Sequence, residues 1–227
     1  MKYLGPNADL DSELSFDVDL DGGVLSIALN RLQQHNAVTP VISSTMQKLL
    51  IAVSGDEAVR VVVLRANDRS FFAGLETFGM PGVAASDEQA LRDLTQPVIA
   101  MVRGQCHSAA IAIIESCDIV IAADDADFDF GGKEAQRNDL VTLTVPAAEL
   151  ETQTYQLARE LVAKDALALR FTKETLRRVT DLSWDEVLNF TGAKQAELKS
   201  MQDGRPSMRA LAVESFLSGK TKPGAGG

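Results

Sequence analysis

The chain has 227 residues, of which 45% are apolar and 24% charged, and these proportions are typical of a soluble globular protein with a sizeable core. No run of about 18 apolar residues is present and the N-terminus is polar, so neither a membrane span nor a signal peptide is predicted. The formal net charge of −10 argues against nucleic acid and anionic membrane as partners, because both bind net basic surfaces, but a few local cations could still bind a small polyanion. Two cysteines without a secretion signal indicate a reducing, cytoplasmic setting.

The first part of the chain alternates strand and helix patterns. Asp21-Gly22-Gly23 separates the apolar segments 16–20 and 24–29, which predicts a β-hairpin whose glycines supply positive φ. Thr39-Pro40 is typical of a helix start, and Ser54-Gly55-Asp56 predicts its end. Further along, apolar runs predict strands covered on both faces, with a helix before the last one: Val59–Leu64, Pro97–Val102, the helix Ala110–Ser116, and Ile119–Ala123. This order predicts an α/β fold of βαβ units with a mainly parallel sheet.

After Pro146 the apolar residues recur at helical spacing. The predicted helices cover Leu150–Leu161, Leu167–Val179, Trp184–Lys199 and Ser207–Leu217. We therefore predict two parts, an α/β core of residues 1–146 and a helical region of residues 147–227. The moderately apolar helices of the second part suit packing on another subunit.

One segment favours a specific chemistry. The chain leaves a buried strand through Gly104–His107 and enters a helix at Ser108-Ala109-Ala110, which presents free backbone N–H groups at a helix N-terminus. Such donors stabilise an oxygen that gains negative charge during a reaction. The alternative is an ordinary strand–loop–helix that packs closely through small residues.

Three segments resemble the crotonase superfamily, the enoyl-CoA hydratase/isomerase family. They are Leu29-Asn30-Arg31 with His35–Val38, then Ser70–Gly74, and then the continuous stretch Gln96–Ala122. The resemblance implies a crotonase-like spiral of βαβ units with a C-terminal helical region. It also implies an acyl-CoA substrate, assembly as a homotrimer or homohexamer, and no metal or cofactor beyond the CoA of the substrate.

The resemblance also implies site residues. One oxyanion-hole amide falls at Leu75, just after Ala73-Gly74, and the other at Ala109. The CoA-binding positions are Arg31, His35, Ala37, Ala73, Gly74, Lys220 and Lys222, where the two lysines would serve an adjacent subunit. Arg65 and Arg69 are further candidate phosphate contacts, although such cations are often only solvated.

The sequence departs from the family pattern at its carboxylates. The first catalytic carboxylate position is occupied by Ala112, and the second aligns with Gly132. Hydration needs paired acid and base groups, so we expect slow hydratase activity. After Gly74 and after Gly131 the chain has fewer residues than the family pattern. A second carboxylate could belong to one of these missing segments.

Two residues are candidate replacements. Glu115 lies one turn beyond Ala112 on the same helix face, and a partly buried carboxylate there would suit a general acid or base. The alternative is a structural glutamate that pairs with Arg103 or with a neighbouring subunit. His107 could titrate near neutral pH, or it could be an ordinary loop histidine.

Three functions from different classes remain open. The first is an enzyme that acts on an acyl-CoA thioester through an enolate, as an isomerase, a lyase or an atypical hydratase. The second is a non-catalytic protein that binds acyl-CoA or partner subunits. The third is a serine hydrolase that uses Ser108, with only His35 and His107 available as its histidine.

Overall fold

The computed structural model describes residues 16–31, 36, 39–66, 71, 83–129, 140–202 and 218, with the backbone alone at 83–86, 107–109 and 129. It divides into two compact units, Met1–Lys164 and Asp165–Gly227. The sequence placed the boundary after Pro146, whereas the helix that follows Pro146 packs against the sheet of the first unit.

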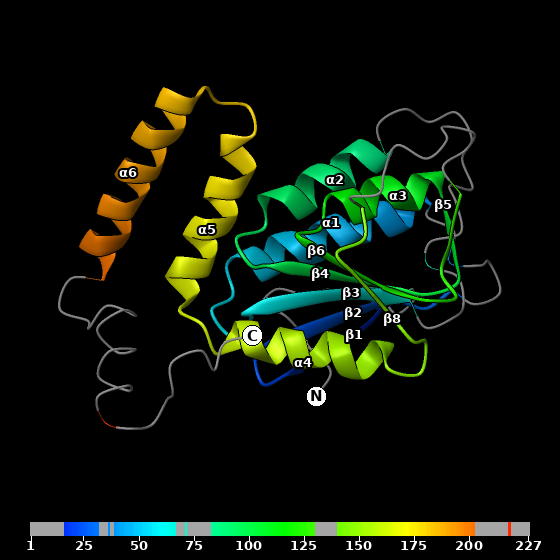
Figure 1. Ribbon diagram of the computed structural model, residues 1–227. Coiled ribbons are helices and arrows are strands. Elements are labelled where there is room, and N and C mark those ends of the chain that lie inside the picture. Colours follow the sequence, from blue (N-terminus) through cyan, green and yellow to red (C-terminus); the bar gives the residue numbers. More distant parts are fainter. Residues whose placement is uncertain are drawn as a thin grey trace. The chain divides into compact units, whose positions relative to one another are not determined.

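Strands and helices of the first unit alternate as predicted (Figure 1). The strands are β1 Phe16–Asp21, β2 Val24–Leu29, β3 Val61–Ala66, β4 Val98–Val102, β5 Gln105–His107, β6 Ile119–Ala123, β7 Asp127–Asp129 and β8 Leu143–Val145. The helices of this unit are α1 Pro40–Ser54, α2 Val83–Asp93, α3 Ser108–Glu115 and α4 Leu150–Val162.

Six strands form one sheet in the order β1-β2-β3-β4-β6-β8, and β5 and β7 form a separate pair. Only β1 runs antiparallel to its neighbour in the larger sheet, so the prediction of a mainly parallel α/β sheet is confirmed. The hairpin is also confirmed, because Gly22 and Gly23 connect β1 to β2 with φ of 54° and 88°. Positive φ is the reason glycine suits both positions.

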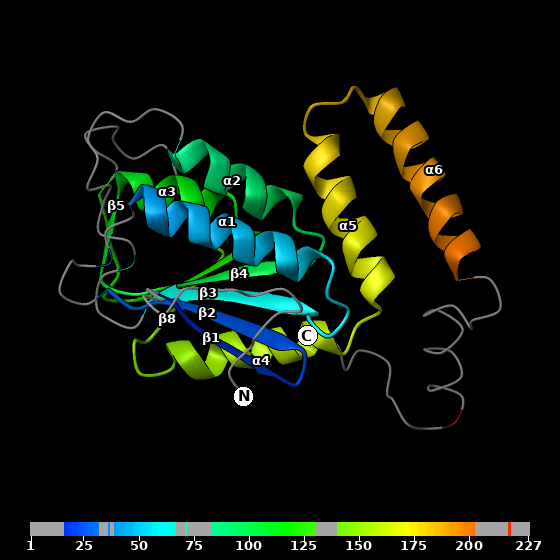
Figure 2. The same cartoon turned by 180° about the vertical axis from the view of Figure 1, so that it is seen from behind.

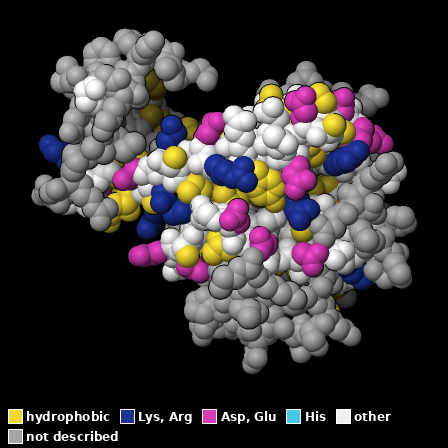
Figure 3. All heavy atoms as spheres, turned by 90° about the horizontal axis from the view of Figure 1, so that it is seen from below, with side chains coloured by type: hydrophobic (Ala, Val, Ile, Leu, Met, Phe, Trp, Pro, Cys, Tyr) yellow, Lys and Arg dark blue, Asp and Glu magenta, His cyan; other side chains and the backbone are white. Residues whose placement is uncertain are grey.

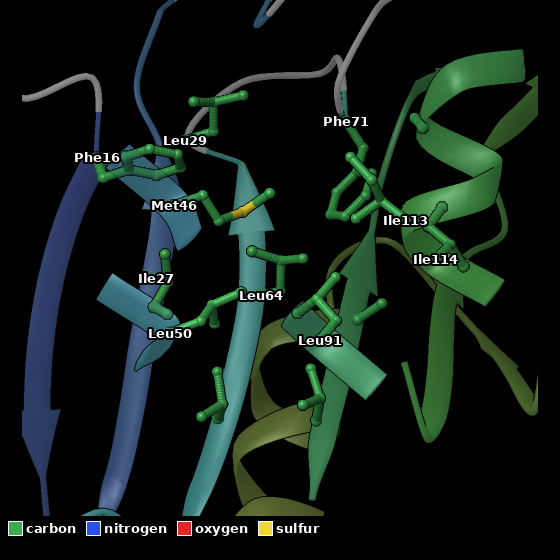
Figure 4. Close-up of a cluster of buried hydrophobic side chains, with 14 of the residues drawn as sticks. Phe16, Ile27, Leu29, Met46, Leu50, Leu64, Phe71, Leu91, Ile113 and Ile114 are labelled. Atoms are coloured by element: carbon green, nitrogen blue, oxygen red, sulfur yellow. The ribbon is translucent and has the colours of Figure 1, made fainter. Parts of the chain in front are cut away.

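Helices cover both faces of the sheet, as Figures 1 and 2 show: α1, α2 and α3 lie on one face and α4 on the other. The predicted start of α1 is confirmed, since the Thr39 hydroxyl accepts the N–H of Ile42 at 3.3 Å. Side chains that alternate along the strands therefore enter two separate cores. Figure 4 shows the core under α1, α2 and α3, where Ile27 and Leu64 meet Met46 and Leu91.

The second unit consists of α5 Ala166–Val179 and α6 Trp184–Met201 within the described part of the chain. Both helices are confirmed. Lys194 of α6 lies 2.9 Å from Glu174 of α5 and 5.1 Å from the centre of the Phe171 ring, which ties the two helices together. The predicted helix Ser207–Leu217 lies outside the described residues.

Charges of both signs mark the surface of the described residues. On the face in Figure 3, acidic and basic side chains are interspersed with apolar ones, so neither sign gathers on that face. No helix in the described ranges is long and apolar enough to cross a membrane.

Candidate active site

The candidate site lies at one edge of the sheet. Because β2, β3, β4 and β6 run parallel, the segments that follow their carboxyl ends meet at the same edge. Those segments include Arg31 after β2, Phe71 after β3 and Gln105–His107 after β4. Ligands of open parallel sheets bind at this edge, outside the carboxyl ends of the strands.

The connection from β4 to α3 is held by a second, smaller pair of strands. Gly104 turns the chain with a φ of 66°, a conformation that strains residues with a side chain. Its carbonyl accepts the N–H of Asp127 at 2.9 Å, and β5 then pairs in parallel with β7. These contacts fix the direction in which the chain enters α3.

The helix that the sequence predicted to begin at Ser108-Ala109-Ala110 is confirmed, and the residues before it, Gln105–His107, form strand β5. Helix α3 begins at Ser108, so the backbone of Ala109 belongs to its first turn, where N–H groups have no partner within the helix. Ala110 and Ile111 are buried in the core. The start of α3 is thus anchored by packing while its first N–H groups point along the helix axis away from the helix.

Phe71 joins the segment after β3 to this connection. Its N–H donates to the carbonyl of Gln105 at 2.9 Å, and its ring is 1% exposed. Figure 4 shows the ring in the core beside Ile113 of α3. Leu75 follows Phe71 by four positions, as Ala109 follows Gln105, so the bond joins the two residues that precede the expected oxyanion amides by this spacing. Leu75 itself lies outside the described residues.

Helix α3 contains both Ala112, at the family's carboxylate position, and Glu115, its candidate replacement. Ala112 is half-buried, whereas Glu115, near the end of the helix, is exposed. The expected partial burial of Glu115 is therefore wrong, because its face of the last turn points to solvent rather than into the core. Arg103, its suggested partner, forms an ion pair with Asp125 at 3.2 Å. A catalytic role for Glu115 stays a prediction.

The structure describes only some of the other predicted site residues. Arg31 is half-buried, and the side chain of Arg65 donates to Ser26 at 3.0 Å, on the sheet face that α4 covers. For His107 and Ser108 only the backbone is described. The residues that lie wholly outside the described ranges are His35, Ala37, Arg69, Ala73, Gly74, Gly132, Lys220 and Lys222.

Sequence reasoning missed a polar brace below the site. The Asp118 carboxylate accepts the N–H of Val98 at 2.8 Å, and the Asp118 N–H donates to the Val98 carbonyl at 2.9 Å. These bonds hold the starts of β4 and β6 together, and thereby the strand that leads to α3. The sequence signal for this brace was a single carboxylate, Asp118, directly before the apolar run Ile119–Ala123.

A second missed feature is the buried carboxyl of Asp87 between α2 and α1. Its Oδ1 accepts from Ser43 at 2.6 Å and from Gln47 at 2.9 Å, while Oδ2 has no hydrogen-bond partner. Burial raises the pKa of Asp87, and the two donated hydrogen bonds offset part of that rise. No local pattern in the sequence distinguishes this aspartate from an exposed one.

The chain is similar to known proteins in both sequence and fold. Residues 19–131 match the profile of the family described as Enoyl-CoA hydratase/isomerase. A hydroxycinnamoyl-CoA hydratase-lyase from Pseudomonas fluorescens is 28% identical over 262 aligned positions, which cover 91% of this chain and 94% of the relative. The alignment is longer than the chain, so the relative has segments that this chain lacks.

Solved structures share the fold. An enoyl-CoA hydratase from Mycobacterium smegmatis superposes with a TM-score of 0.78 at 23% identity, covering 91% of this chain and 97% of that one. Human enoyl coenzyme A hydratase domain-containing protein 3 also has a TM-score of 0.78, at 19% identity, with 92% and 99% covered. The crotonase-like fold expected from the sequence is confirmed.

Proposed function

Because the chain belongs to the enoyl-CoA hydratase/isomerase family of the crotonase superfamily, we propose that it processes an acyl-CoA thioester through an enolate. The observation that carries the proposal is the bond from Phe71 to Gln105, two residues that each precede an expected oxyanion amide, Leu75 or Ala109, by four positions. Two backbone N–H groups at these positions would stabilise the thioester oxygen as it gains charge.

The proposed chemistry begins with removal of a proton from the carbon next to the thioester carbonyl. The electron pair then delocalises onto the carbonyl oxygen, and the enolate is held by the two amides. Return of a proton at a different carbon moves the double bond, which is isomerisation. The same enolate forms without that first proton removal when a β-hydroxyacyl-CoA gives up its hydroxyl proton to a base and the bond between its α- and β-carbons breaks, which releases an aldehyde. The proton then returns to the α-carbon, and the overall change is a lyase reaction, the class to which the name of the Pseudomonas relative refers.

Ala112 favours isomerase or lyase chemistry over fast hydration. Hydration across a double bond needs paired acid and base groups, each worth about 10²–10⁴-fold in rate. An alanine supplies neither function, whereas the helix N-terminus of α3 retains its N–H donors. Glu115 or His107 would then transfer the proton, and their proposed roles are open to direct test.

Turnover of a panel of thioesters tests the proposal. Crotonyl-CoA reports hydration, a β,γ-unsaturated acyl-CoA reports isomerisation, and an aryl β-hydroxyacyl-CoA reports lyase cleavage without a preceding hydration step. We expect isomerase or lyase turnover to exceed hydration of crotonyl-CoA, and Glu115→Gln to lower it by about 10²-fold or more. Glu160→Gln is the matched control, because Glu160 is an exposed carboxylate on α4, across the sheet from α3.

Other outcomes identify the other functions. Binding of CoA without turnover of any thioester would indicate a non-catalytic acyl-CoA-binding protein. Covalent labelling of Ser108 by a fluorophosphonate would indicate a serine hydrolase. Fast hydration of crotonyl-CoA that Glu115→Gln leaves unchanged would contradict the roles proposed for Ala112 and Glu115.

We also propose that the second unit mediates assembly into a homotrimer or homohexamer. Helix α6 buries none of its side chains, and large apolar groups on α5 and α6 are exposed. They are Leu176, Trp184, Leu188 and Met201. A cytoplasmic location accords with the two cysteines, Cys106 and Cys117, neither of which forms a disulfide.

A further inference from the structure

Asn36 closes the chain onto Arg31 directly after β2. The Asn36 N–H donates to the Arg31 carbonyl at 3.0 Å, and the Asn36 Oδ1 accepts the Arg31 N–H at 2.8 Å. Both backbone polar groups of Arg31 are therefore satisfied by one residue. Asn36 is fully buried, although it lies in the connection between a strand and a helix.

The backbone of Asn36 is in an unusual conformation. Its φ is 55°, and it is the one non-glycine residue with a positive φ in the described part of the chain. Asparagine tolerates this left-handed region better than other residues with a side chain, because its short amide bonds locally. The residue thus supplies both the turn and the acceptor that the clamp on Arg31 needs.

The clamp is anchored on both sides. Before it, β2 is buried along its whole length and ends at Leu29. After it, Thr39 caps the first turn of α1. The backbone of Arg31 is therefore fixed between a central strand and a helix, at the same sheet edge as Phe71 and the start of α3.

We propose that Asn36 is a positioning residue for CoA, acting through Arg31. Arg31 is a half-buried basic residue on a chain of net charge −10, at the sheet edge where a CoA ligand is expected. A guanidinium on a fixed backbone contacts a phosphate with less loss of conformational freedom than one on a loose loop. The inference rests on the proposed function, since it takes the anion that Arg31 binds to be a phosphate of CoA.

A double-mutant cycle on CoA binding, measured by calorimetry, tests this inference. Arg31→Gln removes the cation, and Asn36→Gly removes the amide acceptor while keeping the freedom to adopt positive φ. We expect each single variant to weaken the binding of CoA by about 5- to 20-fold, and Asn36→Gly to have little further effect once Arg31 is glutamine. A purely structural role for Asn36 lowers the melting temperature but gives no such coupling.

The outcomes separate the inference from the function on which it rests. A wild-type protein that binds no CoA at millimolar concentration contradicts the proposed function. If the wild type binds CoA but Arg31→Gln binds equally well, Arg31 meets no phosphate and the inference is overturned. Additive losses in the cycle overturn it as well. If Asn36→Gly does not fold, Asn36→Ala takes its place in the cycle, because it also removes the acceptor, and the cost of its positive φ is common to both backgrounds and cancels in the coupling.

Discussion

Phe71 donates its backbone N–H to the carbonyl of Gln105 at 2.9 Å, and this bond ties the segment after β3 to the start of the connection into α3. The two residues are far apart in the sequence, yet each precedes an expected oxyanion amide by four positions. The buried Phe71 ring holds the bond in place, because the ring cannot leave the core without exposing its apolar surface.

The first prediction concerns this ring. Phe71→Ala should lower the free energy of unfolding by about 3–5 kcal/mol, because a fully buried ring leaves a cavity. Phe71→Leu should cost less, since it fills part of the same volume. Urea unfolding measures both, with Leu143→Ala as the control, because Leu143 is 45% exposed. Equal losses in Phe71→Ala and Leu143→Ala would contradict the anchoring role of the ring.

A second prediction follows from the raised pKa of Asp87. A carboxyl whose pKa is higher in the folded than in the unfolded protein costs stability as pH rises from the unfolded pKa through the folded one. Asp87→Asn removes this titration, so the stability of the variant relative to wild type should increase from about pH 4 toward neutrality. The neighbours that donate to Asp87, Ser43 and Gln47, carry no charge and do not titrate.

Thermal unfolding across this pH range checks the prediction about Asp87. Asp93→Asn is the control on the same helix, where the carboxylate is exposed and accepts from Gln89 at 2.8 Å. The stability difference between Asp93→Asn and wild type should show no comparable rise. A difference for Asp87→Asn that stays constant or falls with increasing pH would be inconsistent with the raised pKa.

The two thiols should differ in reactivity. Burial raises the pKa of the Cys106 thiol to about 12, so almost none of it is thiolate at neutral or mildly alkaline pH. Cys117 is half-buried, and its thiol donates to the Ile113 carbonyl at 3.5 Å. We expect an aromatic disulfide reagent to modify one thiol in the native protein at pH 8 and both after unfolding. Cys117→Ser should abolish the native reaction, and equal rates for the two thiols would refute the assignment.

The fourth prediction tests assembly through the second unit. Trp184 is the single tryptophan of the chain and is 73% exposed, so its emission reports on burial by another subunit. With increasing concentration we expect a shift of the emission to shorter wavelength together with a trimeric or hexameric mass by light scattering. Leu188→Glu should prevent both changes, because it places a charge on the exposed apolar face of α6. A monomer at micromolar concentration with unchanged emission would argue against this interface.

Much of the fold could be predicted because its signals are local. The glycines of the first hairpin and the Thr39 cap specify their turns directly, and the buried strands are read from continuous apolar runs. The limits of β3 were two residues too early, since the N–H of Val59 bonds to Asp56 in the turn after α1. Helix α2 was missed because its sequence is largely polar, and β5 and β8 because each has three residues.

Less of the site could be predicted, because its contacts join distant segments. The bond between Phe71 and Gln105 is made by backbone groups, which leave no trace in the choice of side chains. The exposure of Glu115 depends on how α3 ends rather than on its apolar neighbours in the sequence. The clamp of Asn36 on Arg31 falls inside a segment that the family resemblance marks for CoA, but its hydrogen bonds and positive φ required the structure.

Titration of the protein with acetoacetyl-CoA most directly tests the central claim, that this chain holds the enolate of an acyl-CoA. The carbon between the two carbonyl groups of this ligand is acidic, and the enolate that forms absorbs in the near ultraviolet. Donors at Leu75 and Ala109 should favour the enolate. We therefore predict an increase in enolate absorption that saturates with protein concentration and is reversed by excess CoA. Binding without any increase in enolate absorption, or no binding at millimolar ligand, would contradict the account.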